Sequence, residues 1–406
     1  MISLLSGPAV ADGIEALANH TARLGRRPRG GDDLVATLGR SDLRGRGGAG
    51  FPVATKWKSV AAQRNGAPVV LVNGAEGEPL SHKDRVLMQS RPHLVLDGAA
   101  LAAEAVRAGE VILYVGETHA ASRSALRRAL AERPVDEQRR TRLVTAPPRY
   151  VAGEETAAVH CVNDGVALPM TTPPRPYERG VGGRPTLVQN VETLAHVAMI
   201  ARFGDGWFRS LGATAPGTVL LTLCGAVAAP GVVEAPHGTT VAEAVHSAGG
   251  LSAAPRAVLL GGYFGSWVDA ATAETLPLDS GGLRAAGLTL GCGIVAVLAS
   301  DRCGVVETAR ILSHLADESA RQCGPCVFGL RAVAGAVERI AENNAGAGDL
   351  ERVARWGNQL RGRGACGHPD GAAGLLQTAL RVFDDEFAQH QDHGRCTRSV
   401  AARRAA

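Results

Sequence analysis

A glycine-rich loop at residues 43–57 carries the clearest sign of chemistry in the sequence. Four of its six residues at 45–50 are glycine, and Arg44, Arg46 and Lys56 add positive charge around them. Glycine lets a backbone approach a ligand closely and turn its N–H groups toward it. The loop therefore predicts a phosphate cradle. Its Gly-x-Gly-x-x-Gly spacing also fits a dinucleotide fingerprint, but no hydrophobic strand precedes it, so a plain glycine-rich turn is the alternative.

Three cysteines form a second candidate site. Two residues separate Cys323 from Cys326 at the expected start of a helix, and Cys366 follows the middle helices of the same helical region. Two thiolates on one side of a turn suit an iron–sulfur cluster, and zinc or a redox dithiol would use the same pair. The chain has eight cysteines in all, too few for a disulfide scaffold of this length, and the scattered ones are expected to be small buried side chains.

The composition excludes several classes of protein. The 406 residues suffice for two or three domains, and 43 basic against 39 acidic residues leave a formal charge of only +4. Aromatic residues make up 4% of the chain, which argues against a stacking platform for nucleic acid. We find no export signal and no apolar run of about 18 residues. The sequence thus predicts a soluble, cytoplasmic protein that could dock on a membrane complex without inserting.

Alternating strands and helices must position the glycine-rich loop. Apolar strands are predicted at 69–73, 110–116 and 141–145, and helices at 93–107 and 120–131. This alternation is typical of a parallel sheet with helices on both faces, which makes the N-terminal part an α/β domain. In such sheets ligands bind beyond the carboxyl ends of the strands.

Polar residues stand where the first strand ends and where a later helix begins. Asn73, Glu76 and Glu78 follow the first strand, and the adjacent Glu154 and Glu155 enter a helix. An amide and carboxylates can hydrogen-bond a polar ring edge or ribose hydroxyls. The alternatives are an ordinary strand-to-helix turn and favourable electrostatics at a helix N-terminus.

Taken together, these segments resemble the flavoprotein subunit of respiratory complex I (the 51 kDa NADH-binding subunit) and its relatives in NAD-linked hydrogenases and formate dehydrogenases. Four strings match in the same order, at 43–57, 73–79, 150–157 and 183–194. Two positions depart from the family pattern: Ala75 replaces an aspartate, and Gln189 replaces an asparagine.

The resemblance implies an NADH dehydrogenase-like enzyme in which hydride passes from NADH to FMN. Single electrons would then leave through an iron–sulfur cluster to a partner protein or a quinone-linked chain, and no side chain need act as a nucleophile. The residues implied around FMN are Gly45, Arg46, Gly47, Lys56, Asn73, Glu76, Gly153, Glu154, Asn190 and Thr193. Those implied to face the nicotinamide dinucleotide are Phe51, Glu78 and Glu155. The implied partner is a ferredoxin-like or thioredoxin-like iron–sulfur subunit.

The dinucleotide half of the site matches the family less well. Two phenylalanines of the family pattern fall on Ser59 and Arg175, and a lysine falls on Thr172, while Phe51 is kept. Each lost ring would remove about 1–3 kcal/mol of stacking on a base, unless Arg175 stacks there by its planar guanidinium. Two other hypotheses therefore stay open: an FMN and iron–sulfur module fed by a ferredoxin or another flavoprotein, and a non-catalytic adaptor.

The cluster motif lacks one ligand. The family has a cysteine where this chain has Ala320, so the implied ligands are Cys323, Cys326 and Cys366. A four-iron cluster is favoured, a three-iron cluster is possible, and a carboxylate, histidine, water or partner residue would supply the fourth position. Candidate substitutes in this chain are Cys303, His314 and His368.

The sequence predicts four regions. Residues 1–215 form the FMN- and NADH-binding α/β domain, and 216–300 form a ubiquitin-like β-grasp (SLBB-like) module of short strands around one helix. Residues 301–388 form a helical bundle that carries the cluster, and 389–406 form a disordered tail.

Overall fold

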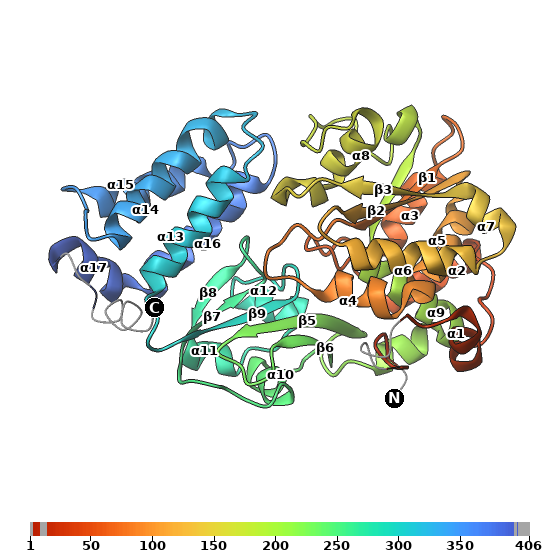
Figure 1. Cartoon of the computed structure of the whole chain (residues 1–406), viewed down its shortest axis with the longest axis horizontal. Coiled ribbons are helices and arrows are strands. Elements are labelled where there is room, and N and C mark those ends of the chain that lie inside the picture. The colour runs from red at the N-terminus through yellow and green to blue at the C-terminus, as the bar shows by residue number, and fades with distance from the viewer. Residues whose placement is uncertain (1–2, 9–13, 394–395, 397–406) are drawn as a thin grey trace. The chain divides into compact units, whose positions relative to one another are not determined.

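The computed structural model describes residues 3–8, 14–393 and 396, and Figure 1 colours the chain from end to end. It divides into two compact units. The first runs to Leu221 and includes Glu234–Gly238, and the second contains Thr222–Val233 and the chain from Thr239 onward. None of the described helices combines the length and apolarity needed to cross a lipid bilayer.

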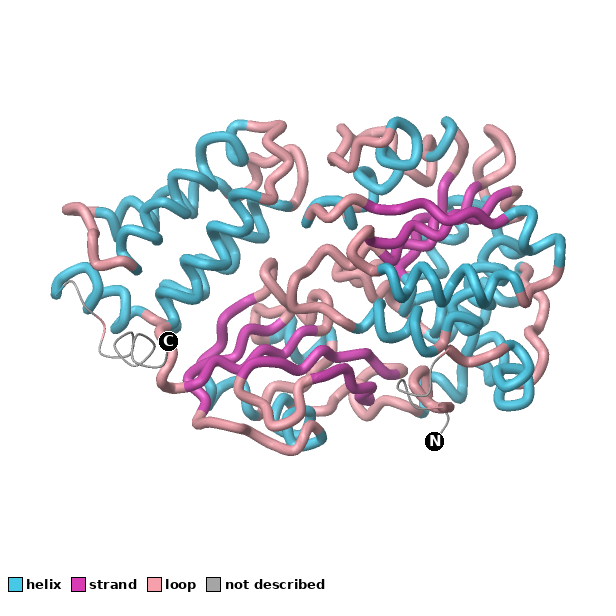
Figure 2. The backbone as a smooth tube through the Cα atoms, viewed as in Figure 1, coloured by secondary structure: helices cyan, strands magenta, loops and turns pink. Residues whose placement is uncertain are grey.

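The first unit is built on a four-stranded parallel sheet (Figure 2). Its strands are β1 (Val69–Gly74), β2 (Glu110–Gly116), β3 (Thr141–Ala146) and β4 (Thr186–Asn190). Strand β1 is buried along its apolar run, and Val69 and Leu71 share a core cluster with residues of helix α8 (Glu155–Asp164). Because β1 also touches helices α5 (Pro92–Val106) and α9 (Val191–Ser210), both faces of the sheet are covered, as the apolar strands predicted.

The order of the strands fixes where a ligand can bind. The sheet runs β3-β2-β1-β4, so the chain moves outward from β1 through β2 to β3 and then returns to the other side of β1. The carboxyl ends of β1 and β4 are therefore a topological switch point, the place where open α/β sheets bind ligands. Asn73 and Asn190 pair in register at this point.

Helices surround this sheet. Their bounds are α1 (Leu17–Leu24), α2 (Asp32–Ser41), α3 (Val53–Ala61), α4 (Lys83–Ser90), α5 (Pro92–Val106), α6 (Ala120–Ala131), α7 (Val135–Arg140), α8 (Glu155–Asp164) and α9 (Val191–Ser210), with 3-10 turns at Tyr150–Gly153 (η2) and Val181–Gly183 (η3). Helix α5 is almost wholly buried, and α9 is buried from Val191 to Ile200. Gly98 permits their contact, because a Cβ there would lie 2.0 Å from the backbone oxygen of Leu194.

A mixed five-stranded sheet in the order β6-β5-β9-β7-β8 belongs mainly to the second unit, and the boundary between the units falls within β5 and β6. Its strands are β5 (Thr218–Gly225), β6 (Gly231–Pro236), β7 (Pro255–Leu260), β8 (Ser266–Asp269) and β9 (Ile294–Ala299), with the short helices α10 (Val241–Ser247), α11 (Ala270–Glu274) and α12 (Ser280–Ala285). Strand β9 pairs parallel with β5 and antiparallel with β7. A Thr240–Glu243 capping box starts α10.

The remainder of the second unit is helical. Its elements are α13 (Gly304–Asp317), the π-helix η4 (Pro325–Leu330), α14 (Arg331–Ala341), α15 (Asp349–Leu360), α16 (His368–Val382) and α17 (Asp384–His393). The disordered tail predicted from residue 389 is wrong at its start, because α17 continues to His393 and His390 is fully buried. Cys396 is buried as well, and 394–395 and 397–406 lie outside the described residues.

Candidate functional site

The glycine-rich loop is closed at its base and open at its tip. Gly45 N–H donates to the Phe51 oxygen at 2.9 Å, and Val53 N–H donates to the Leu43 oxygen at 3.0 Å. Gly48 and Gly50 have positive φ angles of 103° and 62°, which glycine adopts without strain. The loop leads directly into helix α3, whose N-terminus has no side-chain cap. Uncapped N–H groups beside such a loop form an anion-binding site.

The loop lies directly against the switch point. Arg46 N–H donates to Thr193 Oγ1 at 2.8 Å, and a Cβ on Gly47 would lie 3.4 Å from the Cβ of Asn190. Thr193 and Asn190 belong to the start of helix α9, where the Asn190 side chain accepts the N–H groups of the first turn. The structure thus brings four of the residues predicted for FMN, Arg46, Gly47, Asn190 and Thr193, into one contact.

The guanidinium of Arg46 is buried below the loop. Its Nη2 donates to the Thr218 oxygen at 2.9 Å, and its Nε lies 4.0 Å from Glu192 Oε1. That Nε is shielded from solvent and has no hydrogen-bond partner among the described residues. Burial lowers the pKa of Arg46, partly offset by Glu192. A buried donor without a partner is expensive, so it marks a place where a ligand or water is expected to bind.

A buried group of charges supports these residues. Lys83 Nζ lies 2.8 Å from Asp84 Oδ1 and 2.8 Å from Glu192 Oε2, and Asn190 Nδ2 donates to Asp84 Oδ2 at 2.7 Å. Burial, opposed by Lys83, raises the pKa of Asp84 to about 6. Burial acts in the same direction on Glu192, but Lys83, His196 and Arg46 outweigh it and hold its pKa at about 2.

Sequence reasoning missed the role of this group, hereafter the buried charge cluster (Lys83, Asp84 and Glu192). Each residue lies in or beside one of the four matching strings. Because charged side chains are usually exposed to solvent, the sequence offered no reason to expect these three to be buried. The available signal was their position, because Lys83 and Asp84 follow the first strand and Glu192 follows Asn190. Only the parallel pairing of β1 with β4 brings the two segments together.

The segment after β1 is held by its own polar side chains. Asn73 Nδ2 donates to the Gly153 oxygen at 2.8 Å, which joins two of the predicted FMN residues. Glu76 instead accepts hydrogen bonds from the N–H groups of Asp84 and Arg85, both at 2.9 Å. Its carboxylate is thereby committed to the N-terminus of helix α4, and only its backbone remains available to a cofactor.

The second pair of strings meets in the same way. Tyr150 Oη donates to Glu78 Oε2 at 2.8 Å, and a Cβ on Gly77 would lie 2.9 Å from the Tyr150 oxygen. The Glu154 carboxylate caps helix α8 by accepting the N–H groups of Thr156 and Ala157. Glu78 and Glu154 therefore fix the backbone around Gly153.

The rim of the site is more open, and we refer to Phe51, Lys56 and Glu155 as the rim. Phe51 exposes 53% of its surface. Lys56 Nζ forms an ion pair with Glu155 Oε2, and both side chains are partly exposed. An exposed ring beside a cation suits a stacked base and a phosphate.

Neither of the two positions that lack the family's rings carries an aromatic side chain. The Ser59 hydroxyl donates to the Thr55 oxygen of its own helix at 3.0 Å. Arg175 is exposed, and its backbone N–H donates to Glu178 Oε2 at 2.8 Å. Phe51 is thus the one ring that the sequence placed at the dinucleotide and that this structure exposes there.

Cys323, Cys326 and Cys366 come together in the second unit. Cys323 lies two residues before the start of the π-helix η4, which contains Cys326, and π-helical turns are frequent at functional sites. Burial and the nearby thiols of Cys323 and Cys366 raise the pKa of Cys326 to about 12. Hydrogen bonds from the backbone of Ala365 and Cys326, working against burial, lower the pKa of Cys323. The three sulfurs can therefore serve as ligands of one cluster.

The three candidate substitutes for the fourth ligand are engaged elsewhere. His368 Nε2 donates to the Leu315 oxygen at 2.7 Å, and His314 packs edge-on against Tyr263. Cys303 Sγ lies 3.3 Å from His390 Nε2. Ala320 itself is buried and offers no donor atom.

Comparison with protein-family models matches both candidate sites. Residues 38–199 match the Nuo51 FMN-binding domain, 220–262 match the SLBB domain, and 307–390 match the NADH-ubiquinone oxidoreductase-F iron-sulfur binding region. The matched regions contain every residue predicted here to bind FMN or the cluster. The predicted cofactors, FMN and an iron–sulfur cluster, are thereby confirmed at the level of the family.

Individual relatives agree. The NADH-quinone oxidoreductase F2 protein of Rhizobium meliloti is 33% identical over 380 residues, which cover 90% of each chain. The HndC protein of the NADP-reducing hydrogenase of Solidesulfovibrio fructosivorans is 27% identical over 91% of this chain and 78% of its own. A solved structure of an NAD+-reducing [NiFe]-hydrogenase superposes with a TM-score of 0.81 at 31% identity, over 89% of this chain and 63% of the hydrogenase chain. The resemblance predicted from the four strings is confirmed: the chain belongs to the family of NADH-quinone oxidoreductase F subunits.

Proposed function

We propose that this chain oxidises NADH through a bound FMN and passes single electrons through an iron–sulfur cluster to a partner protein. One observation supports this most directly. Four segments distant in sequence meet at the carboxyl ends of β1 and β4, through Arg46 N–H to Thr193 and Asn73 to Gly153. These are the segments that the family resemblance assigns to FMN.

The residues present fit the flavin nucleotide. When bound, FMN accepts a hydride and releases electrons one at a time. The uncapped start of α3, the Gly47 backbone and Lys56 would hold its phosphate, because each offers a donor to an anion. Asn73, Gly153 and Asn190 would position its ring, and the buried Arg46 Nε would gain the acceptor that it lacks.

The rim would receive the dinucleotide. Phe51 is exposed and would stack on a base, while Glu78 and Glu155 would accept hydrogen bonds from ribose hydroxyls or the nicotinamide amide. Glu78 is already oriented by Tyr150. The rings missing at Ser59 and Arg175 imply weaker binding of NADH than in relatives that keep them.

The second unit would carry the electrons onward. Cys323, Cys326 and Cys366 would hold the cluster by three thiolates, with the fourth position filled by water or by a partner's residue, since Ala320 has no donor. Phe328, 75% exposed beside Cys326, would lie at the contact with an iron–sulfur partner subunit. We further propose that 216–300 form a ubiquitin-like β-grasp module, which the SLBB match supports, and that 301–388 form a helical bundle.

A pair of glycine variants tests the flavin site. Gly47→Val fills the narrow space between the loop and Asn190, whereas Gly206→Val adds the same side chain to an exposed position with no neighbour within 4 Å. After reconstitution with excess FMN and desalting, the wild type and Gly206→Val should retain about one FMN per chain. Gly47→Val should retain little. Wild-type protein that retains no FMN would overturn the proposal.

An anaerobic titration tests the electron donor. NADH should bleach the visible flavin band of the reconstituted protein, and NADPH run in parallel reports the preference between the two. A protein that keeps its FMN but is bleached only by a reduced ferredoxin or flavoprotein would favour the alternative module without a dinucleotide.

A further inference from the structure

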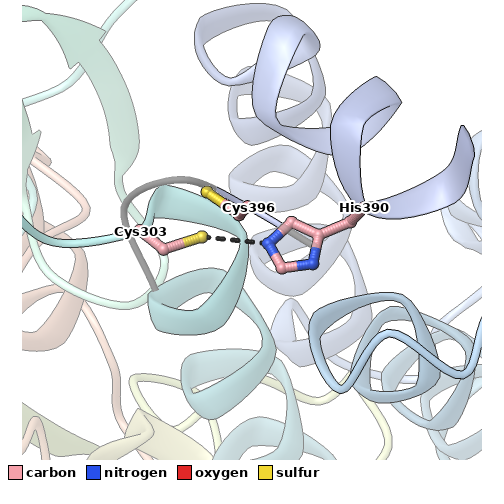
Figure 3. Close-up of side chains that lie close together, drawn as sticks. All are labelled: Cys303, His390 and Cys396. Carbon is pink, nitrogen blue, oxygen red and sulfur yellow. Dashed lines mark hydrogen bonds between the residues drawn. The ribbon is translucent and has the colours of Figure 1, made fainter. Parts of the chain in front are cut away.

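Three buried metal-ligating side chains gather in the second unit outside the proposed cluster site. They are Cys303, His390 and Cys396, and Figure 3 shows their side chains turned toward one another. All three are buried, and one donor atom from each lies within 4.8 Å of the others. Cys303 Sγ is 3.3 Å from His390 Nε2. The proposed electron path uses none of them.

The three residues come from separate segments. Cys303 is the N-cap of helix α13, His390 lies in the last turn of α17, and Cys396 follows that helix. The position of Cys303 suits a thiolate, because a helix N-terminus stabilises negative charge. Chance collapse of small apolar side chains does not explain a fully buried histidine whose Nε2 faces the Cys303 sulfur.

The imidazole is oriented as a metal ligand requires. His390 Nδ1 lies 2.8 Å from Asn343 Oδ1, and an amide oxygen only accepts hydrogen bonds. The proton therefore sits on Nδ1, and the lone pair of Nε2 points toward Cys303. Metal-bound histidines are held in this way by an acceptor on their second nitrogen.

The carboxylate of Glu386 holds together the helices that carry Cys303 and His390. Glu386 accepts the N–H of Gly304 at 2.6 Å and the Nε of Arg256 at 3.0 Å. These bonds hold α17 against the N-terminus of α13, on either side of Cys303 and His390. The donor atoms are thus preorganised without the ion.

We propose that Cys303, His390 and Cys396 bind a zinc ion that joins the segment after α17 to the start of α13. Two thiolates and one imidazole are the sulfur and nitrogen donors that zinc prefers, and the thiolates balance its charge. Water fills the fourth tetrahedral position. Binding releases the two thiol protons to solvent.

Metal analysis of the full-length protein, with its flavin and cluster, tests the site. Wild-type protein purified from zinc-supplemented medium should contain about one zinc per chain in addition to iron. Cys396→Ser and His390→Gln should each lose most of the zinc and keep FMN and iron. Cys366→Ser should show the converse, with iron lost and zinc kept, which separates this site from the proposed cluster. Cys224→Ser is a matched cysteine control that should change neither.

A second variant keeps the test decisive if those proteins fail to fold. Asn343→Gly leaves all three ligands in place, removes the acceptor for His390 Nδ1, and suits the positive φ of 63° at this position. It should weaken zinc binding about 10- to 100-fold in competition with a chelator. Wild-type protein without zinc after reconstitution, zinc retained in Cys396→Ser, or a Cys303–Cys396 disulfide in peptide maps would each overturn the proposal.

Discussion

The buried charge cluster and the rim lie at the same candidate site but differ in kind. Lys83, Asp84 and Glu192 are sealed from water and contact one another. Phe51, Lys56 and Glu155 keep part of their surface open. Charges sealed inside a protein must be paired, whereas exposed groups contribute little to stability and remain available to a ligand. The buried charge cluster therefore maintains the structure of the site, whereas the residues of the rim remain available to bind a ligand.

Removing the buried cation should have the largest effect. Lys83→Met leaves Asp84 and Glu192 close together without their counter-ion. We expect a loss of about 3–5 kcal/mol in the free energy of unfolding, measured by urea denaturation. Lys58→Met, on the exposed face of helix α3, is the matched control and should change it by less than about 0.5 kcal/mol. An equal loss of unfolding free energy in Lys83→Met and Lys58→Met would contradict a structural role for the buried charge cluster.

Acid should weaken the same buried cluster. The pKa of Glu192 is lowered to about 2 from 4.5, so its ionised form stabilises the fold above pH 4.5. That contribution, about 3 kcal/mol, is lost as the pH falls from 4.5 toward 2. Asp84, with a pKa raised to about 6, acts oppositely and stabilises the fold as the pH falls from 6 to 3.8. Unfolding measured across this range should be less acid-sensitive in Glu192→Gln, and an unchanged slope would contradict the assignment.

At the rim, Phe51→Ala should affect ligand binding and leave the fold intact. Loss of one stacked ring costs about 1–3 kcal/mol, or roughly 5- to 150-fold in NADH affinity. Binding can be followed by flavin bleaching at increasing NADH, with retained FMN as the check on the flavin site. Phe328→Ala, an exposed phenylalanine of the second unit, should leave the affinity unchanged.

The smallest expected effect on stability is at the exposed ion pair. Lys56→Met breaks the contact with Glu155, but both groups are partly exposed, and such pairs contribute about 0–1 kcal/mol. Urea denaturation of the protein without FMN should therefore barely distinguish this variant from wild type. FMN retention should fall, because the phosphate loses a cation. A loss of stability as large as that of Lys83→Met would place Lys56 among the residues that build the site.

Local patterns predicted the parts of the fold that depend on neighbours in sequence. The strands near 69–73, 110–116 and 141–145 and the helices near 93–107 and 120–131 are present close to their expected bounds. Strand β4 was missed, since its five residues were interpreted only as part of a motif. Without β4 the pairing of Asn73 with Asn190 could not be predicted, nor the burial of Glu192 beside Lys83.

The features of the candidate sites that could be predicted were likewise those within short stretches of sequence. Motif spacing located the loop at 43–57 and the Cys323–Cys326 pair, because the residues of each motif are close together in the sequence. Spacing could not show that the Glu76 carboxylate caps helix α4, or that Cys303 meets His390 and Cys396. These contacts join segments that no local period connects.

The reversal of strand order at β1 has a consequence for biosynthesis. The three strands β1, β2 and β3 can pair as soon as they leave the ribosome. Asn190 and Thr193 are made only after the long segment between β3 and β4, which contains α8. Closing so large a loop is slow. The glycine-rich loop is therefore synthesised well before Asn190 and Thr193, the residues that it contacts in the folded protein. We expect cofactor loading to be among the last events of maturation.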